Sequence, residues 1–201
     1  MTVTRVPPLS PAKAPLLTRL MYRYAKRRFG EVPEPFAVVA HHRGLLIANV
    51  VHESLLGPTS KKLPTSVREL AVYWTARTVG CSWCVDFGTM LTLKAGFSVQ
   101  RHRELARYDT SDAFTADEKL ALAYADAMTA QPMTVDDDLV ERIRAALGDD
   151  GLVELTYFVA LENFRARTNH ALGITAQGYT RGDACPLPYD VQITAARSAP
   201  S

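Results

Sequence analysis

Residues 80–84 read Gly80-Cys81-Ser82-Trp83-Cys84, and this stretch carries more chemical information than any other part of the chain. Two cysteines three positions apart at the start of a helix lie one turn from each other, where a disulfide can close and reopen. The N-terminus of a helix also favours the thiolate over the thiol, and the thiolate is the nucleophile. The spacing therefore predicts a redox-active dithiol at Cys81 and Cys84.

Two other interpretations of the cysteine pair stay open: a pair of buried core cysteines and half of a structural zinc site. A structural zinc site usually needs two further Cys or His ligands. The chain has no second cysteine pair, and its only closely spaced histidines are the adjacent His41 and His42. Cys185 stands alone in the C-terminal stretch, and we interpret it as structurally incidental. The sequence thus favours redox chemistry and predicts no metal site.

The sequence on both sides of the dithiol has the spacing of amphipathic helices. Pro64 precedes the run Ser66-Val67-Arg68-Glu69, which matches a capping box and predicts a helix that stops at Gly80. The dithiol opens the next helix, which we expect to end near Gly96. A second capping box at residues 115–118 opens a helix that stops before Pro132. Further helices are expected at residues 16–30, 36–55, 136–147 and 152–172.

No segment alternates apolar and polar residues over the length of a strand, so the predicted class is all-α. A chain of 201 residues falls in the range of one domain. We expect a single helical domain over residues 16–173. A proline-rich N-terminal arm (1–15) should precede it, and a C-terminal tail (174–201) should follow it.

Charge and composition exclude several classes of function. The formal net charge is only +2, from 23 basic and 21 acidic residues that are largely scattered, so a nucleic-acid partner is not expected. Charges interrupt the apolar stretches before they reach the length of a membrane span. The N-terminus lacks the apolar core of a secretory signal, so we expect a cytoplasmic protein whose cysteines start out reduced.

A specific spacing connects the dithiol to a known family. Glu69, in the run Arg68-Glu69-Leu70, stands twelve positions before Cys81, and a long late helix runs from Ala160 to Gly173. In these features the chain, from about residue 31 to 173, resembles the carboxymuconolactone decarboxylase and alkylhydroperoxidase D superfamily. The resemblance implies an all-helical fold, a homo-oligomer and chemistry that needs no bound cofactor.

The resemblance also implies roles for three residues. In the peroxidase members the second cysteine attacks the hydroperoxide and the first resolves the sulfenic acid, which would make Cys84 peroxidatic and Cys81 resolving. An external dithiol or protein reductant would then reopen the disulfide. The helix dipole taken alone would favour Cys81 as the more activated thiol. Glu69 is expected to accept the thiol proton, although its position also suits a simple helix cap.

One position departs from the family pattern. The peroxidases carry a histidine four residues after the second cysteine, where an imidazole can take the thiol proton, and here that position is Gly88. Some members also have a histidine where this chain has Trp83. Asp86 lies on a different side of the helix, and we expect it to be a solvated or capping carboxylate. The histidines considered as replacements are His41, His42, His52 and His170.

The remaining candidates carry weaker signals. We expect several aromatic residues to lie in the core or at an interface. For two of them, Trp83 and Phe87, an apolar pocket beside the thiols is an alternative position. The others in this set are Trp74, Tyr157 and Phe158. The polar residues of the last helix, namely Asn163, Arg165 and Asn169, are expected to make surface or intersubunit contacts.

Three functions follow from these patterns. The first is a thiol-dependent peroxidase or disulfide reductase that reduces a hydroperoxide at Cys84. The second is a lyase related to carboxymuconolactone decarboxylase, which would hold a cyclic acid with cationic groups and would not need the dithiol. The third is a helical oligomer that kept the fold but lost efficient catalysis when the relay histidine became Gly88.

Overall fold

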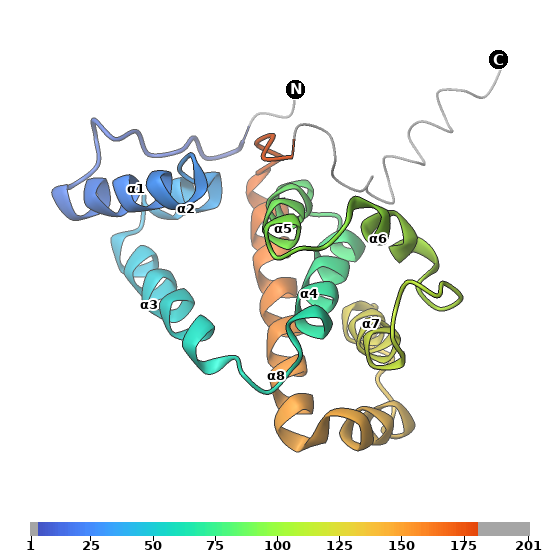
Figure 1. Ribbon diagram of the computed structural model, residues 1–201. Helices are drawn as coiled ribbons and strands as arrows, with labels where there is room; N and C mark the ends of the chain where they lie inside the picture. The colour runs from blue at the N-terminus through green and yellow to red at the C-terminus, as the bar shows by residue number, and fades with distance from the viewer. Residues whose placement is uncertain (1–3, 181–201) are drawn as a thin grey trace, which may run out of the picture. The chain divides into compact units, whose positions relative to one another are not determined.

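The computed structural model describes residues 4–180, apart from the side chain of Pro58. The part of the chain that it describes contains helices and no strands, so the all-α prediction is confirmed (Figure 1). The chain divides into two compact units. The first comprises the residues up to Ser60 together with Ala171–Ile174, and the second comprises Lys61–His170 together with the described residues from Thr175 onward. Cys185 lies outside the described residues.

The first unit begins with residues that pack against its helices. Helix α1 (Leu16–Phe29) ends at Gly30, which adopts a φ of 93°, as the sequence predicts. The N-terminal arm is tied to this unit, because the Tyr22 hydroxyl donates to the carbonyl of Leu9 (3.0 Å). The side of α1 predicted to be apolar stays largely exposed, since Leu16 is 66% and Tyr24 64% accessible.

The predicted second helix is two helices, so this expectation is wrong. Helix α2 (Glu34–Val39) ends before His42, which adopts an extended conformation and starts α3 (Arg43–Thr59). The His42 ring caps α3, because its Nδ1 accepts a hydrogen bond from the amide of Leu45 (3.2 Å). The helix then continues to Thr59, beyond its predicted end at residue 55.

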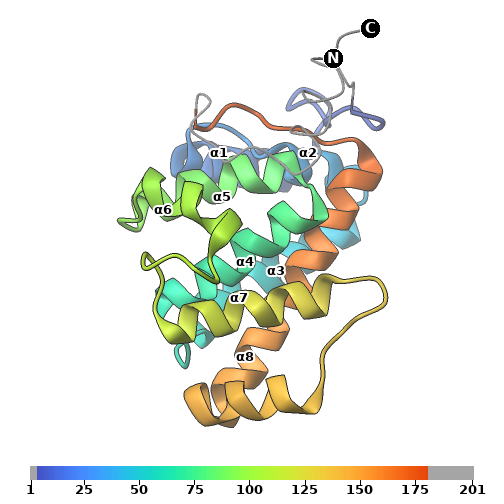
Figure 2. The same ribbon diagram turned by 90° about the vertical axis from the view of Figure 1, so that its right-hand side faces the viewer.

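The second unit holds the dithiol and most of the core. Helix α4 (Thr65–Val79) lies between α5 (Ser82–Lys94) and α7 (Ala116–Thr129) (Figure 2). Between α5 and α7 the chain forms the short helix α6 (Val99–Glu104) and the 3₁₀ helix η1 (Leu105–Arg107). Fully buried alanines, which let backbones approach closely, occur on both α4 and α7, namely Ala71, Ala121 and Ala125.

The last helix, α8 (Asp137–Leu172), contains a break that the sequence predicted. Gly148 has a φ of 71° and a ψ of 173°, which interrupts the helical backbone between the two predicted segments. Only glycine adopts this conformation readily. The second segment ends before Gly173, whose φ is 70°. None of the helices between residues 4 and 180 is long and apolar enough to cross a membrane.

One predicted capping box is present and the other is not. Thr115 and Glu118 make the reciprocal bonds of a capping box at the start of α7. At the start of α4 the N-cap is Pro64, and no side chain caps the helix, so the predicted Ser66–Glu69 box is wrong. The Ser66 side chain instead hydrogen-bonds to buried Glu118. Burial opposes ionisation of Glu118, but bonds from the Thr115 amide, Ser66 and Arg101 hold its pKa below the ordinary value.

Candidate functional site

The two cysteines lie where α4 turns into α5. Gly80 ends α4 in the left-handed conformation (φ 83°, ψ 31°), and Cys81 follows as the N-cap of α5. The Cys81 sulfur accepts a hydrogen bond from the amide of Cys84 (3.1 Å). A disulfide joins the two residues, whose Cα atoms are 5.2 Å apart. Both are buried, but Cys84 is 7% exposed and Cys81 only 1%.

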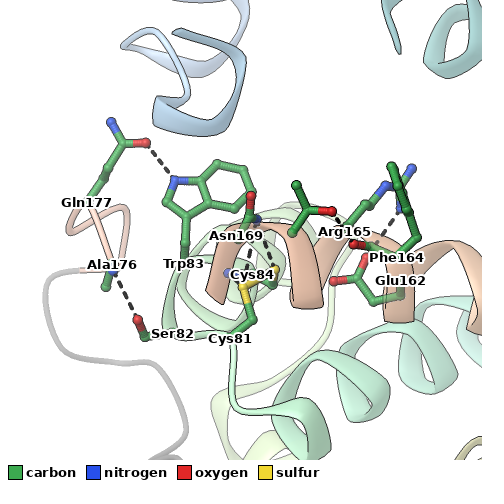
Figure 3. The surroundings of a disulfide bond; sticks show 11 residues. Cys81, Ser82, Trp83, Cys84, Glu162, Phe164, Arg165, Asn169, Ala176 and Gln177 are labelled. Atoms are coloured by element: carbon green, nitrogen blue, oxygen red, sulfur yellow. Dashed lines mark hydrogen bonds and ion pairs between the residues drawn. A yellow bond between two sulfur atoms is a disulfide. The ribbon is translucent and has the colours of Figure 1, made fainter. Parts of the chain in front are cut away.

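Asn169 of α8 lies against this disulfide (Figure 3). Its Nδ2 donates to the sulfur of Cys84 at 3.4 Å and lies 3.8 Å from that of Cys81. The side chain is buried, so the expectation of a surface or intersubunit contact is wrong for this residue. Sequence reasoning missed it because 85 residues separate Asn169 from Cys84.

Asn163 and Arg165, the other two polar residues considered on this part of α8, bond to groups other than the sulfurs. The Nδ2 of Asn163 donates to the Thr129 hydroxyl of α7 (3.0 Å). Arg165 pairs with Glu162 at 3.3 Å, and Glu162 is buried. Asn163 and Arg165 are therefore half-buried and make contacts within the second unit.

An aromatic cluster lies at the first turns of α5. The ring of Trp83 stacks on Phe87, with centroids 4.7 Å apart and planes 17° from parallel. The edge of Tyr179 meets Phe87 at 5.1 Å. The indole nitrogen of Trp83 donates to the side-chain oxygen of Gln177 (2.6 Å). These rings bury apolar surface next to the dithiol and anchor the segment that carries Tyr179.

Residues 175–180, which we call the strap, are fixed to α5 by a buried carboxylate. Asp86 accepts from the amides of Gly178 (2.7 Å), Tyr179 (3.0 Å) and Thr180 (3.0 Å), and from the Thr180 hydroxyl (2.8 Å). The amide of Ala176 donates to the Ser82 hydroxyl (3.3 Å). Asp86 is 3% exposed, so it caps the strap rather than facing solvent.

The space beside Gly88 is filled by a tyrosine ring. A Cβ added at Gly88 would lie 3.2 Å from Cδ2 of Tyr73, closer than ordinary van der Waals contact. Tyr73 is 1% exposed, and its hydroxyl accepts from that of Thr89 (3.1 Å). Glycine at this position is therefore matched to the tyrosine on α4.

The histidine buried most deeply near this region was not among those considered from sequence. His102 of α6 meets the Tyr73 ring edge-on, with centroids 4.7 Å apart. Its Nδ1 faces the carbonyl of Ser98 (3.1 Å) and its Nε2 faces the Thr92 hydroxyl (2.7 Å). Burial lowers the pKa of His102, against the opposing effect of its bond to Ser98. His102 is therefore neutral near pH 7.

The four histidines named from sequence have other surroundings. His41 and His42 lie in the turn before α3, where the His41 ring is hydrogen-bonded to the carbonyl of Pro7 (2.9 Å). His52 lies on α3 in the same first unit. His170 is an exposed residue near the end of α8.

Glu69 lies on α4 beside an arginine. Its Oε1 accepts from the guanidinium of Arg68 at 2.9 and 3.2 Å. The same guanidinium lies over the ring of Phe158 (5.5 Å) and 4.0 Å from Glu154. The Glu69 side chain is 27% accessible, so water reaches the carboxylate. Among residues 4–180 no three His, Cys, Asp or Glu side chains gather in a way that could hold a metal ion.

Comparison with known proteins places this geometry in a family. The model of the carboxymuconolactone decarboxylase family matches residues 51–127. The uncharacterized protein YnjA of Escherichia coli K12 is 33% identical over 176 residues, which cover 88% of this chain and 96% of YnjA. The chain belongs to the carboxymuconolactone decarboxylase family.

Other proteins similar to this chain carry different functional names. The alkyl hydroperoxide reductase Rv2159c of Mycobacterium tuberculosis is 32% identical over 96 residues, 47% of this chain and 27% of that protein. An uncharacterized peroxidase-related protein of Ralstonia eutropha with the alkylhydroperoxidase AhpD core gives a TM-score of 0.77 at 18% identity, over 92% of this chain and 99% of that one.

A cysteine-to-alanine variant of the debrominase Bmp8, in complex with 2,3,4-tribromopyrrole, gives a TM-score of 0.76 at 20% identity, over 90% of this chain and 96% of that one. At such identities the two structural matches establish the fold alone. The fold predicted from sequence is thereby confirmed as the alkylhydroperoxidase D type.

Proposed function

We propose that this chain is a dithiol oxidoreductase that reduces hydroperoxides, with Cys84 as the attacking thiol and Cys81 as the resolving thiol. The observation that carries the proposal is the buried Cys81–Cys84 disulfide at the N-terminus of α5, to which Asn169 donates. A disulfide between residues three apart closes without moving the helix that holds them. The name of the relative Rv2159c, an alkyl hydroperoxide reductase, points to the same chemistry.

The proposed cycle balances in three steps. The Cys84 thiolate attacks the terminal oxygen of the hydroperoxide, an S–O bond forms, the O–O bond breaks, and the alcohol leaves with a proton. The Cys81 sulfur then displaces water from the sulfenic acid and forms the disulfide. An external dithiol reduces this disulfide by thiol exchange and becomes a disulfide itself. One hydroperoxide is reduced for each external dithiol that is oxidised.

Exposure supports the assignment of the two sulfurs. Cys84 is the more accessible cysteine, at 7% against 1%, so a hydroperoxide reaches its sulfur more readily. The Cys81 sulfur already accepts the Cys84 amide, which holds it next to the partner that it resolves. In this scheme Glu69, whose carboxylate accepts from Arg68, receives the proton of the attacking thiol through water.

Loss of an alkyl hydroperoxide in the presence of dithiothreitol tests the proposal. Wild type should consume hydroperoxide, and Cys84→Ser should abolish consumption. Without dithiothreitol, wild type should form the Cys81–Cys84 disulfide, whereas Cys81→Ser should consume one equivalent and stop at the Cys84 sulfenic acid. Cys185→Ser is the matched control and should retain the wild-type rate. Glu69→Gln should slow oxidation of Cys84 by roughly 10²-fold, because general-base assistance is typically worth that much.

Two results would contradict the proposal. Consumption that survives Cys84→Ser would remove the dithiol from the reaction. Wild-type protein that cycles between thiols and disulfide but consumes no hydroperoxide would support the catalytically weakened oligomer instead. A parallel assay with 2,3,4-tribromopyrrole, the ligand of the Bmp8 complex, would show whether the dithiol reduces a carbon–halogen bond in place of a peroxide.

A further inference from the structure

We infer that Asn169 is the group that activates Cys84, by donating its side-chain amide to the thiolate in the reduced protein. This inference rests on the proposed function, because it assigns a role within the same dithiol. It also accounts for a nucleophile at Cys84 in a chain whose family histidine is replaced by Gly88. The role is electrostatic: an amide stabilises a thiolate but takes no proton from the thiol.

The two sulfurs share the Asn169 amide as a hydrogen-bond donor, and they differ in its distance and in the backbone amide that Cys81 also accepts. At the N-cap the Cys81 sulfur accepts the amide of Cys84 at 3.1 Å. The Cys84 sulfur, one turn further along α5, is the nearer of the two to Asn169, at 3.4 against 3.8 Å. Asn169 therefore donates to both sulfurs of the disulfide but lies nearer that of Cys84, whereas the backbone amide of Cys84 donates to the Cys81 sulfur alone.

The surroundings of Asn169 strengthen its effect. Asn169 is 5% exposed and Cys84 is 7% exposed, so little water competes for the sulfur. A hydrogen bond to a charged group is stronger where the local dielectric is low. Ala166, one turn earlier on α8, is fully buried and holds this face of the helix in the core. The amide is therefore placed before the thiolate forms and needs no rearrangement to stabilise it.

This arrangement resolves the choice between the two cysteines. The helix dipole alone favours Cys81, because it lies nearer the N-terminus of α5. In the reduced protein the Asn169 amide donates to the nearer sulfur, that of Cys84, and lowers the pKa of that thiol. It also stabilises the reduced form of the dithiol relative to the disulfide, which makes reduction by an external dithiol easier.

The test is the pKa of Cys84 in a protein with Cys81→Ser and Cys185→Ser, followed by thiolate absorbance in the ultraviolet. Asn169→Ala should raise this pKa by roughly one unit, and Asn169→Asp, which is nearly isosteric and adds a negative charge, should raise it further. Asn163→Ala is the matched control on the same helix, because Asn163 bonds to Thr129, and it should leave the pKa unchanged.

A second measurement needs no substitution at position 169. In the protein that keeps Asn169, its side-chain amide resonances should shift with pH at the midpoint of the Cys84 titration, while those of Asn163 should not.

A third measurement uses the protein that keeps both cysteines of the dithiol. Above pH 9, Asn169→Ala should shift the equilibrium with glutathione about tenfold toward the disulfide.

The inference is overturned if Asn169→Asp folds and leaves the Cys84 pKa unchanged, or if the amide resonances of Asn169 do not follow the thiol. These readouts do not depend on peroxide turnover. A raised pKa in a protein that consumes no hydroperoxide would sustain the role of Asn169 and reject the proposed function. An unchanged Cys84 pKa with normal hydroperoxide turnover would reject the role of Asn169 and sustain the proposed function.

Discussion

Glycine at position 88 matches its surroundings, because the ring of Tyr73 on α4 occupies the space that a side chain would need. A Cβ at Gly88 would lie 3.2 Å from that ring, which is buried and hydrogen-bonded to Thr89. Helix propensity alone favours Gly88→His by about 1 kcal/mol, and the family pattern predicts that the added imidazole speeds oxidation of Cys84. The structure indicates that a side chain at this position requires the Tyr73 ring to shift by a few tenths of an ångström.

We therefore expect Gly88→Ala to lower the free energy of unfolding by about 1 kcal/mol, because crowding of a packed core outweighs the gain in helix propensity. In a Tyr73→Leu background the same substitution should raise it by about 1 kcal/mol. Urea denaturation of the four proteins measures this coupling. Equal effects in both backgrounds would show that Tyr73 does not limit the position. Gly88→His should likewise accelerate Cys84 oxidation only when Tyr73 is also made smaller.

His102 gives the fold a dependence on pH. Its folded pKa lies below the ordinary value of 6.5, mainly because it is buried, so the unfolded chain binds a proton that the folded chain resists. The contribution of His102 to the free energy of unfolding is therefore present above pH 6.5 and is lost as the pH falls below that value. The loss is at most about 1.4 kcal/mol per pH unit.

We expect His102→Gln to remove this component. The difference in free energy of unfolding between wild type and His102→Gln should shrink steadily from pH 7 to pH 5, as measured by urea denaturation at each pH. Parallel curves for the two proteins over that range would mean that folding does not lower the pKa of His102.

Among the elements, the strap and α5 are coupled by one carboxylate. Asp86 accepts four hydrogen bonds from residues 178–180, and the same turns of α5 carry Cys84. A hydrogen bond to a charged group contributes about 1.5–3 kcal/mol. The strap is therefore held to α5 chiefly by Asp86, with support from Ser82 and from the Trp83–Gln177 bond.

We expect Asp86→Asn to open the strap and to increase the rate at which dithiothreitol reduces the disulfide by roughly tenfold, since each 1.4 kcal/mol of lost stability raises the open fraction tenfold. Asp138→Asn provides the control, because the Asp138 side chain is 82% exposed. Thiol release can be followed with a chromogenic disulfide. An unchanged rate together with an unchanged fold would show that reductant reaches the sulfurs without movement of the strap.

At the scale of the molecule, the first unit exposes apolar side chains on two helices. On α1 they include Leu16 (66% exposed) and Tyr24 (64%), and on α3 Val51 (53%) and Leu55 (61%). A monomer in water rarely leaves so many large apolar groups uncovered. These exposures support the homo-oligomer expected from the family resemblance.

Light scattering at micromolar concentration should therefore give a mass that is a multiple of 22.1 kDa. Leu55→Lys, which places a charge on the exposed side of α3, should lower that mass, whereas Arg142→Ala on α8 should not, because Arg142 is a charged side chain outside the exposed apolar residues of α1 and α3. A monomer in the unmodified protein would contradict the prediction.

The sequence by itself determined the local features. Gly30, Gly80, Gly148 and Gly173 all adopt positive φ at the predicted helix ends or break, because glycine alone enters that region without strain. The Thr115–Glu118 capping box and the cysteine pair at a helix start are likewise set by neighbours within four residues. The start of α6 has a local signal too, since Ser98 caps it two residues after Gly96.

Only the tertiary structure decided which distant groups meet. Asn169 reaches the sulfurs from 85 residues away, Asp86 caps a strap more than 90 residues later, and Tyr73 fills the space beside Gly88. Each of these side chains has an ordinary surface role that its local sequence fits equally well. Burial removes that role, because a buried polar group must find a partner in the fold, and the partner depends on how whole helices pack.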